Sequence, residues 1–301
     1  MFDTVQLRAR FIDLDSHYLN QHNPKSFTSY NSSTGELRTT YKVYDELLPY
    51  ITYYDGSHML DVQVSIPKLL FGNNVQQVTE TDIPVFFDRL QERLEQLFCV
   101  KIPHSSWTVI RCDVSWNFQV GNEVPKYVRL LSKQKFAFKS TITYNQDQTV
   151  EYRNKSSRII FYDKEAQLTK MKEPDYIIEQ SRGLLRLEIK PSTNDMKKFS
   201  PTRLAVELIG KPFFEYMTGK VLGEIEYPTE FDELDLSWLL ENRVNIAQIE
   251  RMLGFQRLQE MFDEQTLRKI YTSSTYANRK TEAKKMTIPR GNCLSPLTIS
   301  Q

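Results

Sequence analysis

Apolar and polar residues alternate through most of the first 190 residues, which is the pattern of β-strands with one buried face. The longest such segment is Trp107–Phe118. The same alternation recurs in Asp61–Ile66 and Leu184–Lys190. Gln148–Arg153 and Ser157–Tyr162 flank a polar turn, as the two strands of a hairpin do. Because these strands are short and joined by turns, we expect an antiparallel sheet.

Helical periodicity appears between the strands and dominates the end of the chain. Asp82 opens a segment in which Phe86, Leu90, Leu94 and Leu97 recur at helical spacing. Residues 122–134 and a short stretch from Glu165 predict two more helices. The sequence therefore predicts an α+β fold, an antiparallel sheet with helices on one face.

A domain boundary is expected near residue 200. Ser192–Arg203 is polar, contains Pro201, and is typical of a linker. Beyond it, Asn245 is placed to cap a helix at its start and Gly254 to end it. We therefore expect one domain over residues 1–200 and a smaller helical part over residues 201–301.

The amino-acid composition argues against several classes of function. Thirty-nine basic and 38 acidic residues give a net charge of +1, so any electrostatic footprint must be local. The three cysteines form neither a zinc pattern nor a disulfide framework, and the ten glycines form no nucleotide-binding loop. No apolar run approaches the roughly 20 residues that span a bilayer, so no membrane role is expected. Without a targeting segment the default compartment is the cytoplasm.

The polar faces of two predicted strands carry the candidate chemistry. Each holds an acid two residues from an arginine, Arg111 with Asp113 and Arg186 with Glu188. Carboxylates can hold a hard divalent metal, and arginines neutralise phosphate oxygens. The alternative is that these acids and arginines only pair with each other on a solvated sheet face.

Five segments resemble, in this order, the gene II/gene X family of filamentous-phage and plasmid replication initiators. The resemblance covers about residues 1–200. The segments are FDTVQLRARFID at 2–13, VSIPKLLFGNN at 64–74, VIRCDVSWNF at 109–118, KSSRIIFYDKEAQL at 155–168 and GLLRLEIK at 183–190. The resemblance implies the antiparallel-sheet nuclease fold of rolling-circle initiators and relaxases.

The function implied is nicking and rejoining of origin DNA to start rolling-circle replication. A tyrosine attacks a phosphodiester, remains joined to the 5′ phosphate, and leaves a 3′-OH primer; Tyr162 matches its position. A divalent metal, Mg²⁺ or Mn²⁺, is implied, with no small-molecule cofactor. The expected partners are double-stranded and single-stranded origin DNA and host replication machinery such as a helicase, in a bacterial cytoplasm.

The family's histidine metal motif, His-hydrophobic-His, is absent from this sequence, so either the metal ligands are carboxylates or the enzyme is degenerate. The catalytic candidates are Tyr162 and Lys164, and the metal candidates are Asp113 and Glu188. Asp61, Gln63, His58 and His104 are weaker candidates for completing the site. The phosphate or DNA-binding candidates are Arg111, Arg186, Lys68, Asn73, Arg279, Lys280, Lys284 and Lys285.

The last four candidates lie in a basic run, Arg268–Arg290, that is interleaved with Tyr271 and Tyr276. This combination suits phosphate contact plus base stacking, although a solvated helix face is an equal alternative. Two rival functions remain for the whole chain. One is a non-catalytic origin-binding protein or regulator with the same fold, and the other is a scaffold in which the charges merely pair.

Overall fold

The computed structural model describes residues 1–145, 148–227, 245–285 and 294–299. Its chain divides into two compact units, one made of residues 1–226 with 296–301 and the other of residues 227–295. The boundary expected near residue 200 is therefore wrong, and residues 201–226 belong to the first unit. The described residues do not include the acidic residues Glu230, Asp232, Glu233 and Asp235.

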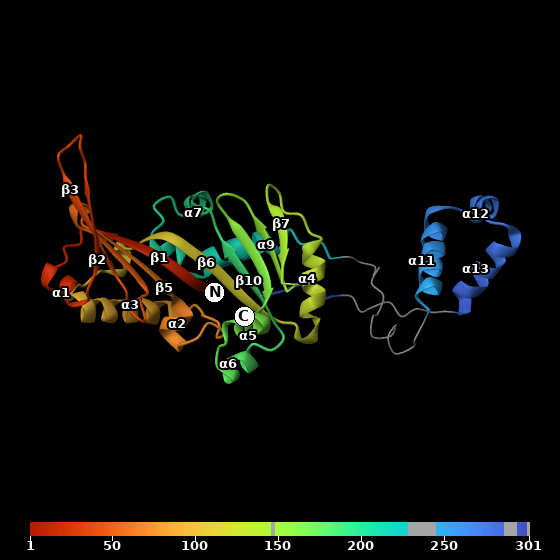
Figure 1. The fold of residues 1–301 in the computed structure, drawn as a ribbon, viewed down its shortest axis with the longest axis horizontal. Coiled ribbons are helices and arrows are strands. Elements are labelled where there is room, and N and C mark those ends of the chain that lie inside the picture. The colour runs from red at the N-terminus through yellow and green to blue at the C-terminus, as the bar shows by residue number, and fades with distance from the viewer. Residues whose placement is uncertain (146–147, 228–244, 286–293, 300–301) are drawn as a thin grey trace. The chain divides into compact units, whose positions relative to one another are not determined.

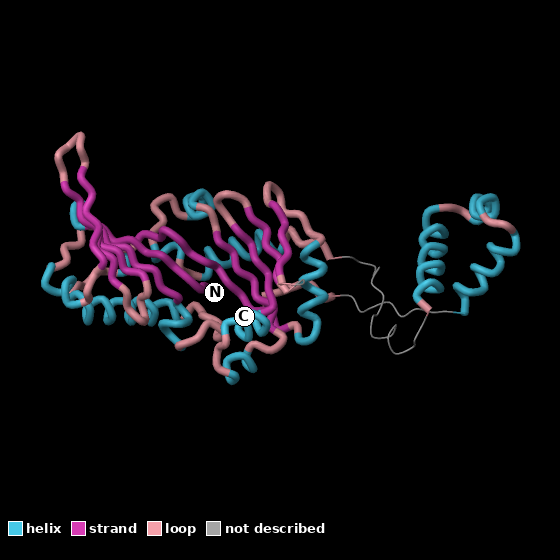
Figure 2. The backbone as a smooth tube through the Cα atoms, in the orientation of Figure 1, coloured by secondary structure: helices cyan, strands magenta, loops and turns pink. Residues whose placement is uncertain are grey.

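The first unit is an α+β fold built on one ten-stranded antiparallel sheet (Figures 1 and 2). The strand order is β2-β3-β4-β5-β1-β6-β10-β9-β8-β7. The strands are β1 (Phe2–Arg10), β2 (Lys25–Tyr30), β3 (Leu37–Val43), β4 (Tyr50–Tyr54), β5 (Met59–Ser65), β6 (Thr108–Gln119), β7 (Ser140–Tyr144), β8 (Thr149–Arg153), β9 (Arg158–Asp163) and β10 (Leu184–Lys190).

The predicted strands and the hairpin between β8 and β9 are confirmed. Asn154 Oδ1 closes the hairpin turn by accepting hydrogen bonds from the backbone N–H groups of Ser156 and Ser157. The sequence did not predict β2 or β7 as strands, and these two form the edges of the sheet.

The two halves of the sheet share a topology. In each half a long central strand, β1 or β6, is followed by a four-stranded meander whose last strand returns to pair with it. The two central strands then pair with each other. The sequence contains no repeat that would predict this arrangement.

Helices of the first unit lie between or after the strands. They are α1 (Ser16–Gln21), α2 (Ile66–Phe71), α3 (Asp82–Phe98), α4 (Val124–Ser132), α5 (Lys164–Met171), α6 (Asp175–Gln180), α7 (Thr193–Phe199), α8 (Ala205–Leu208) and α9 (Lys211–Leu222). The helices predicted from Asp82, over residues 122–134 and from Glu165 correspond to α3, α4 and α5.

Apolar side chains on one face of the sheet pack against α4 and α9. Phe214 of α9 meets Trp116 at a ring-centroid distance of 5.5 Å and Phe2 at 6.4 Å. Beside α4, the Tyr152 hydroxyl donates to the carbonyl of Leu131. One end of the opposite, polar face is covered as well, because Leu168 of α5 and Ile177 of α6 pack with Val75 and Leu184.

The second unit contains α11 (Ile246–Met261), α12 (Glu264–Ile270) and α13 (Ser273–Lys285). Asn245 caps α11 as expected, accepting from the Ala247 N–H. Gly254 does not end the helix, which continues to Met261. Burial of Phe255 with Leu267 and Tyr276 stabilises the continued helix against the cost of an internal glycine, about 1 kcal/mol.

The linker expected at residues 192–203 is also wrong, because α7 lies within it. Ser192 and Asp195 form a capping box, in which the Ser192 hydroxyl accepts from the Asp195 N–H and Asp195 accepts from the Ser192 N–H. These reciprocal bonds satisfy the first donors of a helix whose composition alone is polar.

We expect Ser192→Ala to lower the free energy of unfolding by about 1 kcal/mol, because the N-cap acceptor is lost. Urea denaturation followed by circular dichroism measures the change. Thr193→Ala, at an exposed position in the same turn, is the control and should be near neutral. Equal effects of the two substitutions would show that the capping box contributes nothing.

Candidate active site

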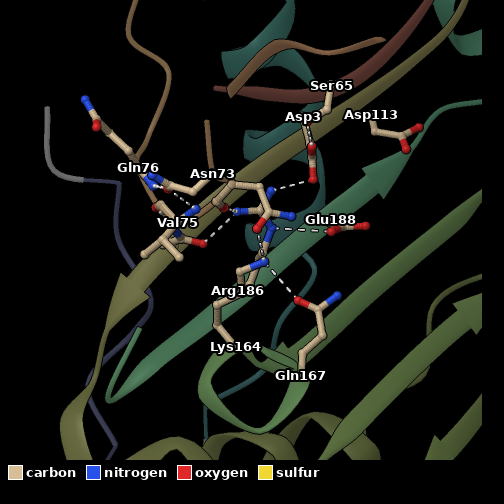
Figure 3. Close-up of polar contacts among 12 residues, drawn as sticks. Asp3, Ser65, Asn73, Val75, Gln76, Asp113, Lys164, Gln167, Arg186 and Glu188 are labelled. Atoms are coloured by element: carbon tan, nitrogen blue, oxygen red, sulfur yellow. Dashed lines mark hydrogen bonds and ion pairs between the residues drawn. The ribbon is translucent and has the colours of Figure 1, made fainter. Parts of the chain in front are cut away.

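A buried guanidinium organises the polar face of the sheet. The Arg186 side chain is 2% exposed. Its Nη2 donates to Asp3 Oδ2 at 2.7 Å, and its Nε lies 3.3 Å from Glu188 Oε1. Its Nη1 donates to Asn117 Oδ1 at 3.1 Å and to the carbonyl oxygen of Asn74 at 3.0 Å. Figure 3 shows Arg186 between Asp3 and Glu188. Arg186 thus joins β1, β6, β10 and the segment after α2.

Asp3 reaches Arg186 because β1 is irregular at its start. The pairing of β1 with β6 shifts register between Phe2 and Val5, and such bulges redirect side chains. The second carboxylate oxygen of Asp3 accepts from the Ser65 hydroxyl at 3.0 Å. Sequence reasoning missed Asp3, although it lies in the first segment of the family resemblance.

Tyr162 lies directly opposite Arg186 in the pairing of β9 with β10, on the same face of the sheet. Its hydroxyl donates to Glu188 Oε1 at 2.5 Å. Burial raises the pKa of the Tyr162 phenol well above its usual range, and the nearby Arg186 charge opposes this shift. The phenol is therefore protonated at neutral pH and has a carboxylate already in place to accept its proton.

Tyr162 and Glu188 both line a cleft of about 420 Å³ between the β8–β9 hairpin and α5. The Tyr162 side chain is only 6% exposed, so the cleft is the route by which its hydroxyl can meet a ligand. Polar side chains complete the lining, among them those of Asn145, Gln148, Thr149, Gln167 and Lys170. None of these five was singled out from the sequence, since each is an ordinary polar residue there.

Lys164 is the first residue of α5, and it is fully buried. Its Nζ donates to Asn74 Oδ1 at 3.1 Å and to Gln167 Oε1 at 2.9 Å (Figure 3), and lies 5.8 Å from the centroid of the Tyr162 ring. Burial, reinforced by the Arg186 charge, lowers the pKa of Lys164 to about 7. Lys164 thus lies beside Tyr162, and its full burial keeps it from direct contact with a phosphate in this conformation.

Asp113 shares the polar face with Glu188 but has its own partners. Arg111 binds it in a bidentate pair, Nε to Oδ1 at 2.9 Å and Nη2 to Oδ2 at 2.5 Å, and Lys190 lies 3.7 Å away. Burial raises the pKa of Asp113 despite these cations. By the strand register Asp113 is a diagonal neighbour of Glu188, about 7–8 Å away.

The implied metal was tested against these donors. Among the described ranges no group of three His, Cys, Asp or Glu side chains is placed to hold a metal ion. Both oxygens of Asp113 are engaged by Arg111. The hydrogen bond from Tyr162 and the ion pair with Arg186 both fall on Oε1 of Glu188, and Glu188 lines the cleft. Since Mg²⁺ is often held by one or two carboxylates plus substrate phosphates, Glu188 fits such a role.

The remaining sheet candidates do not line the Tyr162 cleft. Asp61 is in a bidentate pair with Arg8, and His58 and His104 lie near Asp13 and Asp88. Asn73 is a turn residue, because its Oδ1 accepts from the N–H groups of Val75 and Gln76 (Figure 3). Lys68 and Gln63 line a separate hollow of about 270 Å³ that also touches Asp3 and Asn74.

In the second unit, Tyr276 is buried, which argues against base stacking as its role and leaves the alternative of a solvated basic face. Tyr276 is 2% exposed and forms the core with Phe255 and Leu267. Arg268 lies over its ring at 4.9 Å and pairs with Glu264 at 2.7 Å. Arg279 pairs with Glu282 at 2.9 Å and Lys280 with Glu264 at 3.5 Å. The side chains of Lys284 and Lys285, and all of Arg290, lie outside the described residues.

Comparisons with known proteins add no identification. No family model matches the chain, and no curated protein matches it significantly. Among the described helices, none is long and apolar enough to cross a membrane.

Lys164 should make stability depend on pH. Between its folded pKa of about 7 and the usual 10.5, the unfolded chain binds a proton that the folded protein does not. The free energy of unfolding should therefore rise with pH across this window, by at most about 1.36 kcal/mol per unit. Denaturation of the wild type and Lys164→Met from pH 6 to 9 measures the difference, with exposed Lys170→Met as control. A difference that stays flat with pH contradicts the assignment.

Arg186→Met should lower the free energy of unfolding by roughly 3–5 kcal/mol, because Asp3 and Glu188 lose their buried counter-charge. Arg182→Met is a matched control: Arg182 is 69% exposed, and its surface pairs with Glu165 and Glu179 should contribute less than about 1 kcal/mol. Chemical denaturation compares the two variants. Similar losses in both variants would show that Arg186 contributes no more to stability than a surface arginine.

Proposed function

We propose that this protein nicks and rejoins one strand of origin DNA to start rolling-circle replication, with Tyr162 as the nucleophile. The observation that carries the proposal is the hydrogen bond from the Tyr162 hydroxyl to Glu188 in a cleft of the polar face. A nucleophile held against a base is the arrangement that nucleophilic catalysis requires. The resemblance of five ordered segments supplies the reaction class, and with it the rolling-circle nuclease type of fold.

In the proposed reaction, the Tyr162 oxygen attacks the scissile phosphorus as its proton passes to Glu188. The new Tyr–phosphate bond forms while the bond to the 3′ oxygen breaks, and that oxygen takes up a proton to become the 3′-OH. A phenol is a stronger acid than a sugar hydroxyl, so the aryloxide is a tolerable leaving group when the 3′-OH later attacks the phosphotyrosine. The same residues therefore serve nicking and rejoining.

A bound Mg²⁺ or Mn²⁺ would polarise the scissile phosphate. Glu188 Oε2 would hold it together with phosphate oxygens, and Asp113 would join only if Arg111 moved. Arg186 acts in this scheme as a positioning residue, since its donors are taken by protein acceptors. It fixes Glu188 and its positive charge favours the phenolate over the neutral phenol.

The second unit is proposed to bind duplex DNA. α12, a two-residue turn and the longer α13 follow one another around a shared core, as in helix–turn–helix units. Ser274, Asn278 and Thr281 are exposed along α13. Phosphate contact by Arg279 and Lys280 would compete with their acidic partners, so we expect α13 to add specificity more than charge.

A non-catalytic origin-binding protein is the second candidate. Burial of Tyr162 and the pairing of Asp113 with Arg111 favour it, because both are also what a structural network would show. The two functions differ in one outcome, which is covalent attachment of the protein to DNA.

Tyr162→Phe should abolish the covalent protein–DNA adduct and leave folding intact, because one hydroxyl is removed. Glu188→Gln should slow adduct formation by about 10²–10⁴-fold, since the proton acceptor is lost. The assay incubates supercoiled origin DNA with protein and Mg²⁺ or Mn²⁺, then detects protein-linked DNA in denaturing gels.

Tyr144→Phe is the matched control. Tyr144 also donates to a glutamate, Glu151, at 2.9 Å, but on the edge of the sheet. It should form the adduct at the wild-type rate. An adduct formed by Tyr162→Phe and lost in Tyr144→Phe would move the nucleophile to Tyr144. Absence of any adduct with the wild type on its origin would favour the non-catalytic function.

A further inference from the structure

Exposed aromatic and lysine side chains gather on β2, β3, the loop after β3 and the first residue of β4. We call Lys25, Phe27, Lys42, Tyr44 and Tyr50 the aromatic platform. Phe27 is 56% exposed, and Tyr44 and Tyr50 are each 57% exposed. So many large exposed rings in one place are unusual for a surface that only faces water.

The lysines of the platform are held by rings. Lys42 Nζ lies 5.2 Å from the Phe27 ring centroid, and Lys25 Nζ lies 5.4 Å from that of Tyr44. Of the acids nearby in sequence, Glu36 pairs with Arg38 and Asp45 pairs with Arg93. Within the described chain no ion pair engages Lys25 or Lys42. The platform is therefore aromatic and carries two lysine charges.

Strand register places the platform on the face that carries Tyr162. Lys42 is opposite Lys25 on one side and Thr52 on the other, and Tyr50 is opposite Gln63. Gln63 is in turn opposite Gln6, and Gln6 is opposite Arg111, the partner of Asp113. Because directly paired residues share a face, Tyr50 on β4 and Tyr162 on β9 lie on the same face of the sheet. Five inter-strand steps of about 4.8 Å separate them by about 24 Å across the strands, and the six residues from Arg111 to Asn117 on β6 add about 20 Å along the strands.

The hollow around Lys68 lies between the aromatic platform and the Tyr162 cleft. It is lined by Pro49, next to Tyr50, and by Asp3, the partner of Arg186. Lys68 is exposed there. A cation and polar side chains thus continue the surface from the platform toward the Tyr162 cleft.

We infer that the aromatic platform binds the unpaired bases of single-stranded DNA and thereby lays the strand across the sheet toward Tyr162. This inference rests on the proposed function for the strand's destination, but the binding itself does not. Unpaired bases offer π-faces that stack on exposed rings, whereas in a duplex these faces are occupied by neighbouring base pairs. Lysines beside the rings complement the phosphates of the same strand.

The test measures fluorescence anisotropy of a labelled mixed-sequence oligonucleotide, single-stranded or annealed to its complement, with the full-length protein. Phe27→Ala with Tyr50→Ala should weaken single-strand binding at least about 10-fold and change duplex binding less than about twofold. Lys25→Gln with Lys42→Gln should lower the slope of log affinity against log salt by about 1.4. Circular dichroism checks that each variant folds. If the double alanine variant does not fold, the double lysine variant alone tests the inference.

Tyr30→Ala is the matched control. Tyr30 lies on the same hairpin and is 65% exposed, but strand alternation places it on the opposite face from Phe27. It should bind single strands as the wild type does. Unchanged binding by the alanine and lysine pairs, or an equal loss in Tyr30→Ala, would overturn the inference. So would sedimentation showing that the wild type self-associates and the alanine pair does not.

Failure of the proposed function gives a different pattern. A wild-type protein that binds single strands through the platform but forms no covalent adduct with origin DNA would leave the platform standing and remove Tyr162 as a nucleophile. If instead the protein forms the adduct and the platform variants keep full single-strand affinity, Tyr162 stands as the nucleophile and the platform is excluded as the binding surface.

Discussion

One buried charge determines how the polar face of this sheet is built. Arg186 is almost fully enclosed, and a guanidinium removed from water is stable only if acceptors replace its hydration. Asp3, Glu188, Asn117 and the Asn74 carbonyl supply them from four parts of the chain. Because Glu188 is fixed by Arg186, the Tyr162 hydroxyl that donates to it is fixed too. The geometry on which any chemistry of Tyr162 depends therefore follows from satisfying Arg186.

Much of the fold could be predicted from the sequence, since alternation with period two reports directly which side chains face a core. It correctly predicted β6, β10 and the β8–β9 hairpin, and it assigned Asp113 and Glu188 to the polar faces of their strands. The edge strands β2 and β7 were missed because an exposed strand buries no face, so its pattern is weak. The helix at 193–199 was missed because a capping box, not apolar periodicity, begins it.

The contacts of the site were less predictable than its faces. Asp3 and Arg186 are 183 positions apart, and only a local register shift in β1 brings the carboxylate to the guanidinium. Asn74 also reaches the site by a turn, which the sequence shows only as a polar cluster. Burial was invisible too: Lys164 resembles any solvated lysine, yet it is enclosed and its pKa is lowered to about 7. Sequence patterns report local preference, whereas these features arise from long-range packing.

The shared topology of the two halves explains how one face can combine two different surfaces. Each half places a meander beside its central strand, so equivalent positions on β4–β5 and β9–β10 face the same side. In the second half α5, α6 and the segment after α2 cover that side, which encloses Arg186 and shifts the pKa values of Lys164 and Tyr162. In the first half the corresponding side is left open, and its rings and lysines remain available to a flat, anionic ligand. Coverage, more than strand geometry, separates the half suited to chemistry from the half suited to binding.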